Sequence, residues 1–530
     1  IPAGNSERAR AVLTGLLHLA RLVRVGFVLT REGVFGLADP AALSAGGRMA
    51  VRLLRLFERR GAGGSRLAVA MTRLGPTYVK LGQFLATRPD LVGIRTAREL
   101  EQLQDRMPSF PRDVSLEIIA ASLGRPVEAA FTDIGEPVAA ASVAQAHRAR
   151  IGGDSARTVA VKVLRPGVRE RFARDVDAML YAAGLAERHV PDMRRLRPVD
   201  SIRDFQRAVA METDLRLEAA ALSELRQNST DDALFRVPAV DWERTGRDVL
   251  TTEWVDGIPI ANHAALDAAG HDRKALAVVA MQTFLRHAMR DGFFHADMHQ
   301  GNLFVDADGR LVAVDCGIMG RLGFRERRFL AEILYGFITR DYRRVSEVHF
   351  EAGYVPAHHS VDQFAQAIRA IGEPIHDRPA RDISMARLLT LLFEVTGLFD
   401  MATRTELVLL QKTMIVVEGV SRSLDEDFDM WAAAEPVIRE WIERHLGPVG
   451  MIENAGHGTR DLFRIAARLP DTLERAERVL ARLDSSSADG FRLAPESIAA
   501  IGKAEARGNR LPALALWAIV ALIIYAMVSG

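Results

Sequence analysis

The sequence predicts an α+β protein in which a small sheet lies among long helical regions. Three observations lead to this fold class. Period-two alternation in Thr158–Leu164 indicates a strand, because alternate side chains of a strand point to opposite faces. Two short apolar runs on either side of Asp306–Gly309 indicate a hairpin. Beyond Gly323 the apolar residues follow a helical period, with expected breaks at residues 353–356 and 372–374.

Composition excludes several classes of protein. The chain has 530 residues and a formal net charge of +1, with positive and negative residues interleaved, which removes the electrostatic argument for nucleic-acid binding. Cys316 is the only cysteine, so an intrachain disulfide and a cysteine-based zinc site are excluded and a reducing compartment is favoured. Only five of the 69 basic residues are lysine, so a lysine needs a reason beyond positive charge.

Two helices are predicted in the N-terminal part. Residues 9–30 have an amphipathic pattern with scattered arginines, typical of a helix that packs on the protein's own core or lies on a membrane surface. A second helix is predicted over Pro76–Arg88, since proline suits a first helical turn. Lys80 and Gln83 share one face of it. A glycine in its interior, Gly82, indicates that another segment approaches the backbone closely.

Between the helical regions the pattern changes to that of strands. Phe131–Ile134, Pro137–His147 and Thr158–Leu164 predict a three-stranded meander with a turn of small residues. Alternation in the last run puts Lys162 on the face opposite its two valine neighbours. A lysine on an apolar strand is commonly an edge or surface residue. In the Val-Ala-Val-Lys setting of a lysine-poor chain, we interpret it as a phosphate anchor.

The helical region that follows holds two informative carboxylates. Residues 208–222 predict one helix, on which Glu212 and Glu218 lie six residues apart, about 120° around the axis. They can therefore face two different partners. We take Lys162 and Lys80 as those partners by hypothesis, and the alternative is a solvated acidic face.

The stretch His295–Gly317 combines a polar loop, a strand, a turn and a second strand. This arrangement can bring Asp297, Asn302 and Asp315 to one end of a hairpin. Their oxygen-bearing side chains could there hold Mg²⁺ and a phosphate chain. The alternative is that these residues serve turn formation alone.

The C-terminal part predicts a linker and a membrane anchor. Ser485–Gly490 has the composition of a flexible linker. Leu511–Val528 contains 18 residues without a charge, which as a helix would cover about 27 Å, close to the thickness of the hydrocarbon layer. A buried C-terminal helix is the alternative. Arg507 and Arg510 precede this segment, so the positive-inside tendency places the large soluble part in the cytoplasm.

The order of these pieces is that of a protein kinase: strand lysine, helix glutamate, linker strand, catalytic-loop aspartate with an asparagine five residues on, and strand-end Asp-x-Gly. In detail the chain resembles the UbiB family of atypical kinase-like proteins over about residues 75–320. The motifs that resemble those of the family are Lys80–Gln83 (its KxGQ element), Ala139–Ser142 (its alanine-rich loop), Glu212–Asp214 (its ExD element), His295–Asn302 (its catalytic loop) and Asp315–Gly317 (its metal-binding loop).

The resemblance implies a bilobal kinase-like fold with a small antiparallel-sheet N-lobe, a helical C-lobe, an N-terminal helical extension and a C-terminal transmembrane helix. The expected domains are the helical extension with the KxGQ element (1–110), the N-lobe (111–260), the helical C-lobe with the catalytic loop (261–484), a linker (485–510) and the transmembrane helix (511–528). Relatives commonly have two adjoining membrane helices, whereas one fits here.

The resemblance also implies roles for particular residues. Asp297 and Lys162 would be catalytic, with Lys162 on the nucleotide phosphates and paired with Glu218, while Asn302 and Asp315 would hold Mg²⁺. The other nucleotide-binding residues would be Ala139, Ala140, Ala141, Ser142, Val143, Ala144, Gln145, and Glu253 and Val255 against adenine. The KxGQ and ExD elements would contribute Lys80, Gln83, Glu212 and Asp214, with Lys80 paired to Glu212.

In relatives the extra KxGQ element covers the place where a protein substrate would dock, which argues against ordinary protein phosphorylation. The methyl groups of Ala139–Ala141 support this caution, because they disfavour the positive φ angles with which glycines close over phosphates. Gln300 stands where the family often has proline, and Cys316 where kinases usually have phenylalanine. Neither change removes a metal-binding or proton-transferring group.

The expected function is an atypical kinase-like ATPase that uses ATP and Mg²⁺ and supports ubiquinone biosynthesis. It would be anchored in the cytoplasmic (bacterial inner) membrane, act on or present hydrophobic quinone precursors, and have other ubiquinone biosynthesis proteins as candidate partners. One alternative is a pseudokinase scaffold that binds nucleotide and lipid. Another is a small-molecule kinase of the aminoglycoside or choline type, whose catalytic loops His295–Asn302 also resembles.

Overall fold

The computed structural model describes residues 4–34, 49, 52–58, 66–86, 88, 92–100, 103, 107–153, 156–189, 197–376, 395, 398–401 and 405–446. The chain divides into two compact units, residues 1–438 and 439–530. The predicted linker at 485–510 and the predicted membrane helix at 511–528 lie outside the described residues. Among the helices that are described, none has the length and apolar character needed to cross a bilayer.

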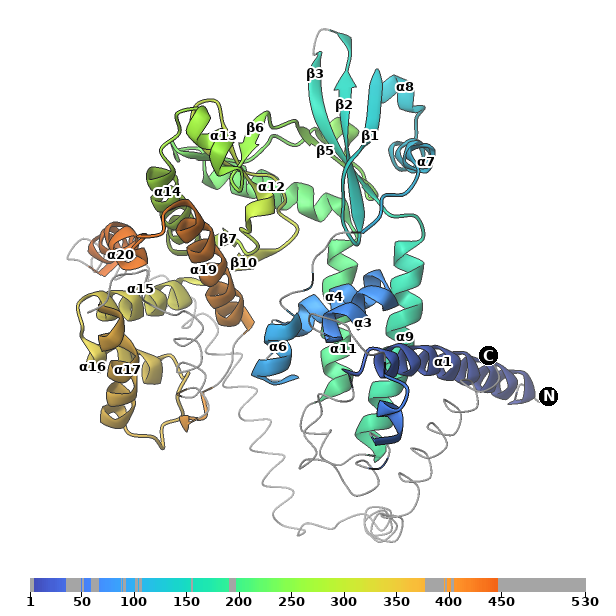
Figure 1. The fold of residues 1–530 in the computed structure, drawn as a ribbon, viewed down its shortest axis with the longest axis horizontal. Coiled ribbons are helices and arrows are strands. Elements are labelled where there is room, and N and C mark those ends of the chain that lie inside the picture. The colour runs from blue at the N-terminus through green and yellow to red at the C-terminus, as the bar shows by residue number, and fades with distance from the viewer. Residues whose placement is uncertain are drawn as a thin grey trace, which may run out of the picture. The chain divides into compact units, whose positions relative to one another are not determined.

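The first sheet is antiparallel, with strand order β1-β2-β3-β5 (Figure 1). Its strands are β1 (Asp133–Ala140), β2 (Ala144–Ile151), β3 (Arg157–Leu164) and β5 (Val249–Glu253). The predicted three-stranded meander is therefore present, but the turn between β1 and β2 falls at residues 141–143. It lies inside the run that the sequence predicts as one strand, because a run of small residues gives alternation no contrast to mark the turn.

One face of this sheet packs against α7 (Arg112–Leu123) and α8 (Val127–Ala130), which lie to one side of the strands in Figure 1. The core there contains Ile119 and the valines of β3, all fully buried. Lys162 lies between two of these valines in sequence and is only half-buried, so it is on the opposite face, as the alternation predicts.

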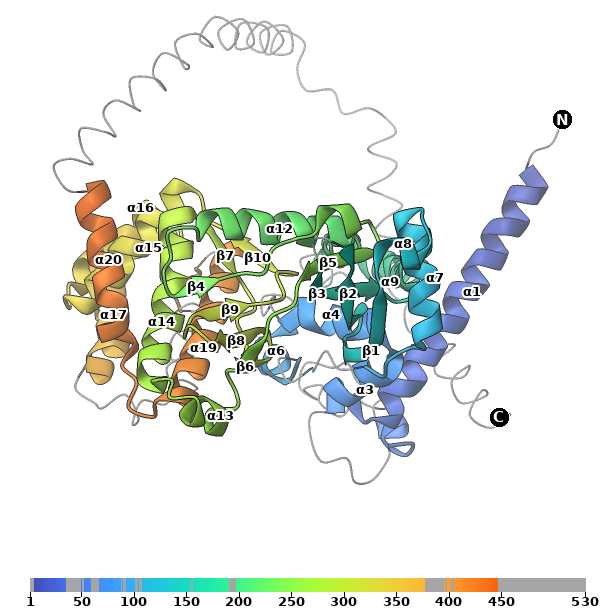
Figure 2. The ribbon, with the colours of Figure 1, turned by 90° about the horizontal axis from the view of Figure 1, so that it is seen from above.

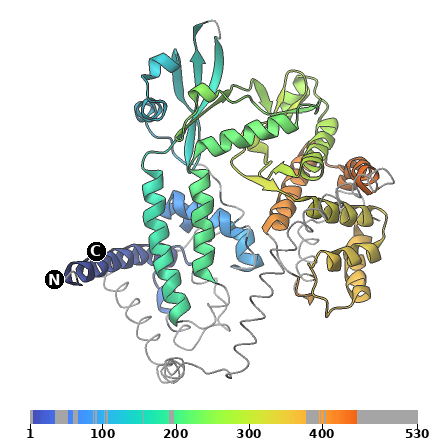
Figure 3. The same ribbon diagram turned by 180° about the vertical axis from the view of Figure 1, so that it is seen from behind.

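The N-terminal region is helical, and the predicted amphipathic helix at residues 9–30 is α1 (Gly4–Arg31). The other helices are α3 (Arg66–Leu74), α4 (Pro76–Ala86), α6 (Ile94–Leu100), α9 (Val168–His189) and α11 (Pro198–Glu212). Figure 3 shows α9 and α11 side by side. The rings of His18 in α1 and Tyr181 in α9 stack with their centres 5.4 Å apart. Thus α1 packs on the protein's own helices, the first of the two predicted alternatives.

The helix predicted over residues 208–222 is in fact two helices, which corrects the sequence prediction. α11 ends at Glu212, and α12 (Leu215–Asn228) begins after an N-cap at Asp214, whose carboxylate accepts a hydrogen bond from the backbone N–H of Arg216 (3.2 Å). Thr213 turns its hydroxyl back to the carbonyl of Val209 (2.9 Å). Short polar side chains compete with the helical backbone in this way, and here they end one helix and start the next.

The predicted hairpin is confirmed as β8 (Leu303–Asp306) and β9 (Leu311–Ala313). These strands form the centre of a second sheet, in the order β4-β9-β8-β6, with β4 (Phe235–Arg236) and β6 (Gly257–Pro259). In the turn, one carboxylate oxygen of Asp306 accepts from the backbone N–H of Asp308 (3.1 Å) and of Arg310 (2.9 Å), and Gly309 has a φ of 77°. A two-stranded sheet pairs β7 (Phe293–His295) with β10 (Met319–Arg321).

Most of the remaining described elements are helices, and those beyond Gly323 agree with the helical period predicted there. They include α13 (His263–Ala268), α14 (Arg273–Arg286), a π-helical turn (His287–Asp291), α15 (Phe324–Ile338), α16 (Tyr342–Glu351), α17 (Val361–His376), α19 (Thr405–Leu424) and α20 (Met430–Leu446). α14 packs against α19 (Figure 2). The break expected at 372–374 is wrong, because α17 continues through it. Gly372 instead allows a close contact between α17 and Tyr342, since a Cβ there would collide with the tyrosine ring.

Candidate nucleotide and phosphoryl-transfer site

The site is organised around the ammonium group of Lys162 on β3. Its Nζ donates to both carboxylate oxygens of Glu218, at 2.7 and 2.9 Å. Glu218 lies in the first turn of α12, where a negative charge also interacts favourably with the helix dipole. The Lys162 side chain is 24% exposed and that of Glu218 only 9%, so the ion pair is shielded while the lysine keeps one open side.

Asp315 completes a triangle with this pair. Its Oδ2 accepts a third hydrogen bond from Lys162 Nζ (3.1 Å), and its Oδ1 accepts from the backbone N–H of Gly317 (2.9 Å). Asp315 lies two residues after the end of β9 and its side chain is 42% exposed, the most open of the three. The structure therefore brings together a strand lysine, a helix glutamate and a strand-end aspartate from positions 162, 218 and 315.

The charges of the triangle influence one another strongly. Burial raises the pKa of Glu218 to about 7, an effect that Lys162 reduces and Asp315 increases. Burial alone would raise the pKa of Asp315 as well, but the positive charge of Lys162 and the Gly317 N–H hold it well below its usual range. The pKa of Lys162 lies above its usual range, because the two carboxylates outweigh the effect of burial. Where Glu218 is ionised, above about pH 7, one cation between two carboxylates leaves excess negative charge at the open side.

The catalytic loop is fixed by the short β7–β10 sheet and by its own histidine. His295 ends β7 and is fully buried, and its Nδ1 accepts a hydrogen bond from the backbone N–H of Asp297 (3.0 Å). Burial lowers the pKa of His295, consistent with a neutral ring that can accept this bond. The carboxylate of Asp297 is 31% exposed and lies 3.7 Å from Nε2 of His299. Asp297 is thus held through its backbone while its carboxylate remains accessible.

Asn302 links the loop to the hairpin. Its side-chain Nδ2 donates to the backbone carbonyl of Asp297 (3.2 Å). The backbone carbonyl of Asn302 accepts from the backbone N–H of Val314 (3.1 Å), next to Asp315. With its NH₂ group engaged in this way, the side-chain oxygen is the remaining ligand atom of Asn302. A carboxylate and an amide oxygen are the hard donors that Mg²⁺ prefers, so the chemistry of Asp315 and Asn302 fits this ion.

Contacts from α19 that the sequence did not indicate also hold the catalytic loop. The hydroxyl of Thr413, fully buried, donates to the backbone carbonyl of Ala296 (3.1 Å). Gln300, which departs from the proline common in the family, donates from Nε2 to the hydroxyl of Ser423 (2.7 Å). The residue that departs from the family pattern therefore gains a partner on α19. The only signal in the sequence is that α19 has small polar residues among its apolar ones.

The alanine-rich loop is tied to its surroundings through its backbone. The N–H of Ala141 donates to the carbonyl of Ala144 (2.8 Å), the carbonyl of Ala141 accepts from Nε of Arg165 (2.7 Å), and the carbonyl of Ala140 accepts from the N–H of Met107 (3.3 Å). Among the predicted nucleotide-binding residues of the loop, Ala139, Ala140 and Ala141 are exposed or half-buried. Ser142, Val143 and Ala144 are buried, so their side chains do not form an open phosphate cradle.

The side chain of Gln145 is buried and hydrogen-bonded rather than open to a ligand. Its side chain, 1% exposed, accepts from the backbone N–H of Phe110 (2.9 Å) and donates to the carbonyl of Phe110 (3.1 Å) and to the hydroxyl of Ser115 (2.9 Å). His147 is also buried and lies within hydrogen-bond distance of Ser115 Oγ (2.9 Å) and of the carbonyl of Gly135 (2.9 Å). Burial lowers the pKa of His147. This polar cluster fixes the β1–β2 hairpin on the segment before α7.

The linker after β5 is anchored by an arginine that the sequence did not single out. Arg236 donates from Nη1 to the carboxylate of Glu253 (2.9 Å) and from Nε to the carboxylate of Asp306 in the hairpin turn (2.9 Å). The Glu253 carboxylate therefore serves the fold, which leaves its backbone and that of Val255 as the groups that could face adenine. That role stays a prediction.

The KxGQ and ExD elements lie together in the helical region. Lys80 on α4, 8% exposed, forms an ion pair with Glu212 at the end of α11. Asp214 caps α12 and binds the guanidinium of Arg216 (2.6 and 2.9 Å), which lowers its pKa. Gln83 is half-buried on α4. Both lysine–glutamate pairings that the resemblance implies are present among the described residues.

Comparison with known proteins identifies the family. Residues 102–349 match the ABC1 atypical kinase-like domain, and residues 368–429 match the UbiB helical domain. A probable protein kinase UbiB of Marinobacter nauticus is 42% identical over 396 residues, 74% of this chain and 72% of that protein. Another of Pseudomonas entomophila is 38% identical over 471 residues, 87% of each chain. A solved Mycobacterium tuberculosis structure, the complex of Rv3197 with erythromycin, has 24% identity and a TM-score of 0.49, covering 68% of this chain and 90% of that one. The chain belongs to the UbiB family of ABC1 atypical kinase-like proteins.

Proposed function

We propose that the protein is an ATP-dependent phosphoryl-transfer enzyme of the atypical kinase type, acting as an ATPase in ubiquinone biosynthesis at the cytoplasmic membrane. The observation that carries the proposal is the triangle of Lys162, Glu218 and Asp315, with Nζ–O distances of 2.7 to 3.1 Å. It lies beside a catalytic loop whose aspartate is accessible. A decayed site would have no reason to keep all of these groups.

The residues present fit Mg²⁺-ATP. Asp315 and Asn302 would hold the metal ion, and Lys162, kept in place by Glu218, would contact the phosphates. When bound, Mg²⁺ would neutralise the negative charge that develops on the phosphates during transfer. Asp297, fixed through its backbone N–H and carbonyl, would orient the attacking hydroxyl or water and accept its proton.

The surroundings of the site favour ATP turnover without a protein acceptor. The alanine-rich loop has backbone groups committed to Met107, Ala144 and Arg165, which limits how closely it can fold over a phosphate chain. The predicted role of Lys80 and its neighbours in covering a protein-docking surface points the same way. We therefore assign water or a small hydrophobic molecule as the acceptor.

The membrane and quinone parts of the proposal rest on the family and on the sequence. The relatives carry the name UbiB, and residues 511–528 keep the composition of a membrane helix. A lipid-soluble quinone precursor would be accessible to an enzyme held at the bilayer surface. Quinone intermediates that accumulate in cells carrying Asp297→Asn, but not in wild-type cells, would identify the blocked step.

The test of the enzymatic proposal is phosphate release from Mg²⁺-ATP by the full chain with liposomes present. Asp297→Asn should lower the rate by about 10²- to 10⁴-fold, the contribution typical of a general base. The matched control is Asp308→Asn, the same change at an aspartate of the hairpin turn that is 71% exposed and pairs with Arg310. If Asp297→Asn hydrolyses ATP as fast as wild type, the enzyme proposal fails and the nucleotide-binding scaffold is the better description.

A further inference from the structure

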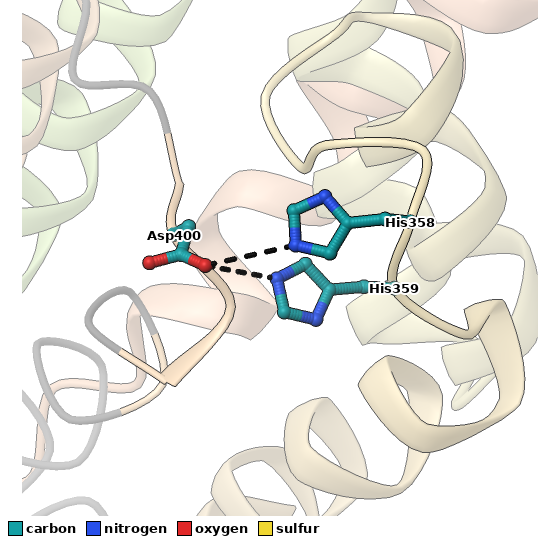
Figure 4. A group of neighbouring side chains, drawn as sticks. All are labelled: His358, His359 and Asp400. Atoms are coloured by element: carbon teal, nitrogen blue, oxygen red, sulfur yellow. Dashed lines mark hydrogen bonds and ion pairs between the residues drawn. The ribbon is translucent and has the colours of Figure 1, made fainter.

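A second group of side chains able to bind a cation lies outside the site described above. His358 and His359 belong to the turn between α16 and α17, and Asp400 belongs to the described segment 398–401 before α19 (Figure 4). None of the three is part of the nucleotide site or of the KxGQ and ExD elements. The two histidines lie between the kinase-like match, which ends at residue 349, and the helical-domain match, which spans 368–429, whereas Asp400 lies inside the second match.

Three potential ligand atoms converge at this place. Nε2 of His359 is 3.3 Å and Nε2 of His358 is 3.7 Å from the same carboxylate oxygen of Asp400. Ligand atoms from all three residues lie within 4.8 Å of one another. In a tetrahedral zinc site with metal–ligand bonds of about 2.0–2.2 Å, neighbouring ligand atoms are about 3.3–3.6 Å apart. The two nitrogen–oxygen distances of 3.3 and 3.7 Å are close to this spacing, so one ion can contact both imidazoles and the carboxylate.

The ligands are mounted on a common apolar core. The ring of His359 lies against that of Phe399 (5.3 Å between centres), and Phe399 packs edge-on against Phe364 of α17 (5.0 Å). Phe399 and Phe364 are both buried members of one hydrophobic cluster. Asp400 follows Phe399 directly, so the same cluster holds the backbone that carries the carboxylate and also contacts one imidazole. Pre-positioned ligands favour metal binding, because less freedom is lost when the ion binds.

The donor set of the group suits a transition metal. The centres of the two imidazole rings are 4.1 Å apart, which is close enough for both rings to share one ion with the carboxylate. Two imidazoles and one carboxylate form a donor set typical of zinc, whereas Mg²⁺ prefers oxygen ligands alone.

We propose that His358, His359 and Asp400 form a zinc-type transition-metal site, with the fourth position open to water, that fastens the α16–α17 turn to the segment before α19. The ion acts as a staple between two segments that are 41 residues apart at His359 and Asp400. Because it binds the folded arrangement and not the unfolded chain, it raises stability by an amount that grows with the logarithm of its affinity. The staple is independent of ATP turnover and goes beyond the proposed function.

The test uses the full chain in detergent micelles, stripped with a chelator and then dialysed into buffer with excess Mg²⁺ to occupy oxygen-lined sites. Zn²⁺ is titrated by calorimetry, and Co²⁺ is used as a spectroscopic probe, because its visible absorption is stronger in tetrahedral than in octahedral surroundings. Wild type should bind one more Zn²⁺ than the variants His359→Ala and Asp400→Asn. Loss of a direct ligand should weaken this binding by more than the roughly 10- to 100-fold typical for an outer-shell partner.

His271→Ala is the matched control, because His271 is a half-buried histidine near Gly309 in the hairpin turn and outside the cluster. Zn²⁺ should also raise the Tm of the wild type, because the ion binds the folded protein. His271→Ala should keep the Zn²⁺ stoichiometry, the Co²⁺ spectrum and this rise of Tm. Equal Zn²⁺ binding by wild type, His359→Ala and Asp400→Asn would overturn the site. A loss of Tm in Asp400→Asn that is the same in chelator and in Zn²⁺ would also overturn it, because the three residues would then form an ion pair alone.

Discussion

Two lysine–glutamate pairs of the same chemistry occupy different environments in this protein. Glu212 and Glu218 are six residues apart, and the helix break at Thr213 and Asp214 directs one to Lys80 and the other to Lys162. The first pair lies among the N-terminal helices. The second faces the catalytic hairpin and gains Asp315 as an additional carboxylate.

The difference shows how one ion-pair type can serve two purposes. Two carboxylates around Lys162 leave excess negative charge at a partly open site, which is an arrangement suited to a bound cation and its phosphates. Lys80 is 8% exposed and joins the end of α11 to α4, so its pair fastens helices to one another. A buried ion pair contributes little net stability, but removing one partner leaves an uncompensated charge. The two pairs should therefore respond differently when the lysine is removed.

The largest expected effect comes from removing each lysine in turn, because the loss of Lys162 should affect activity and the loss of Lys80 should affect stability. Lys162→Met should lower ATP turnover about 10²- to 10³-fold, the loss typical when one electrostatic group is removed from an active site. Its effect on stability should be smaller, because Glu218 with its raised pKa can take up a proton. Lys80→Met should lower the free energy of unfolding by about 1–3 kcal/mol, since it leaves the partly buried Glu212 without this lysine.

Phosphate release and denaturant unfolding of both variants measure these effects. The same loss of turnover in Lys80→Met, with unfolding unchanged, would show that the first pair is catalytic and would remove the contrast between them.

A smaller effect distinguishes the pairs by pH. Burial raises the pKa of Glu218 from 4.5 to about 7 in the ligand-free protein. The folded protein therefore binds a proton that the unfolded chain has already lost, and the stability that comes from this group falls as pH rises from about 4.5 through about 7. The change should amount to as much as about 3 kcal/mol. Glu218→Gln should abolish this part of the pH dependence and Glu212→Gln should retain it. If Glu218→Gln keeps the pH dependence of stability seen in the wild type, a group other than Glu218 takes up the proton.

The arrangement of side chains in the candidate site was predicted from the sequence better than the path of the chain around it. Lys162 could be placed because alternation in a strand specifies which face a side chain takes, and Asp297, Asn302 and Asp315 because they lie close together in one hairpin motif. The division of residues 208–222 into α11 and α12 was not predicted, since the apolar period continues across Thr213 and Asp214. The side chains that end and cap the helices there act through local hydrogen bonds rather than through periodicity.

Apart from the two lysine–glutamate pairs that the resemblance implies, contacts between distant segments were not predicted from the sequence. Thr413 and Ala296 are 117 residues apart, and Arg236 and Asp306 are 70 apart. No local pattern connects such positions, so the support of the catalytic loop by α19 and of the linker by Arg236 had to come from the structure. The inward turn of Gln145 was missed for a related reason, because its partner at Phe110 precedes the sheet.

The smallest expected effect tests how closely the segment carrying Lys80 is packed. The sequence predicted a close approach at Gly82, and a Cβ there would collide with the side chain of Leu103. Gly82→Ala should destabilise the protein by about 1 kcal/mol, because overpacking of about 1–3 kcal/mol outweighs the gain in helix propensity. Gly184 in α9 is the matched control, since a Cβ there meets no described atom within 4 Å. Gly184→Ala should therefore stabilise by about 0.5–1 kcal/mol. Opposite signs in denaturant unfolding would support tight packing of α4, whereas stabilisation by both changes would mean that the first lysine–glutamate pair lies in a looser region than the second.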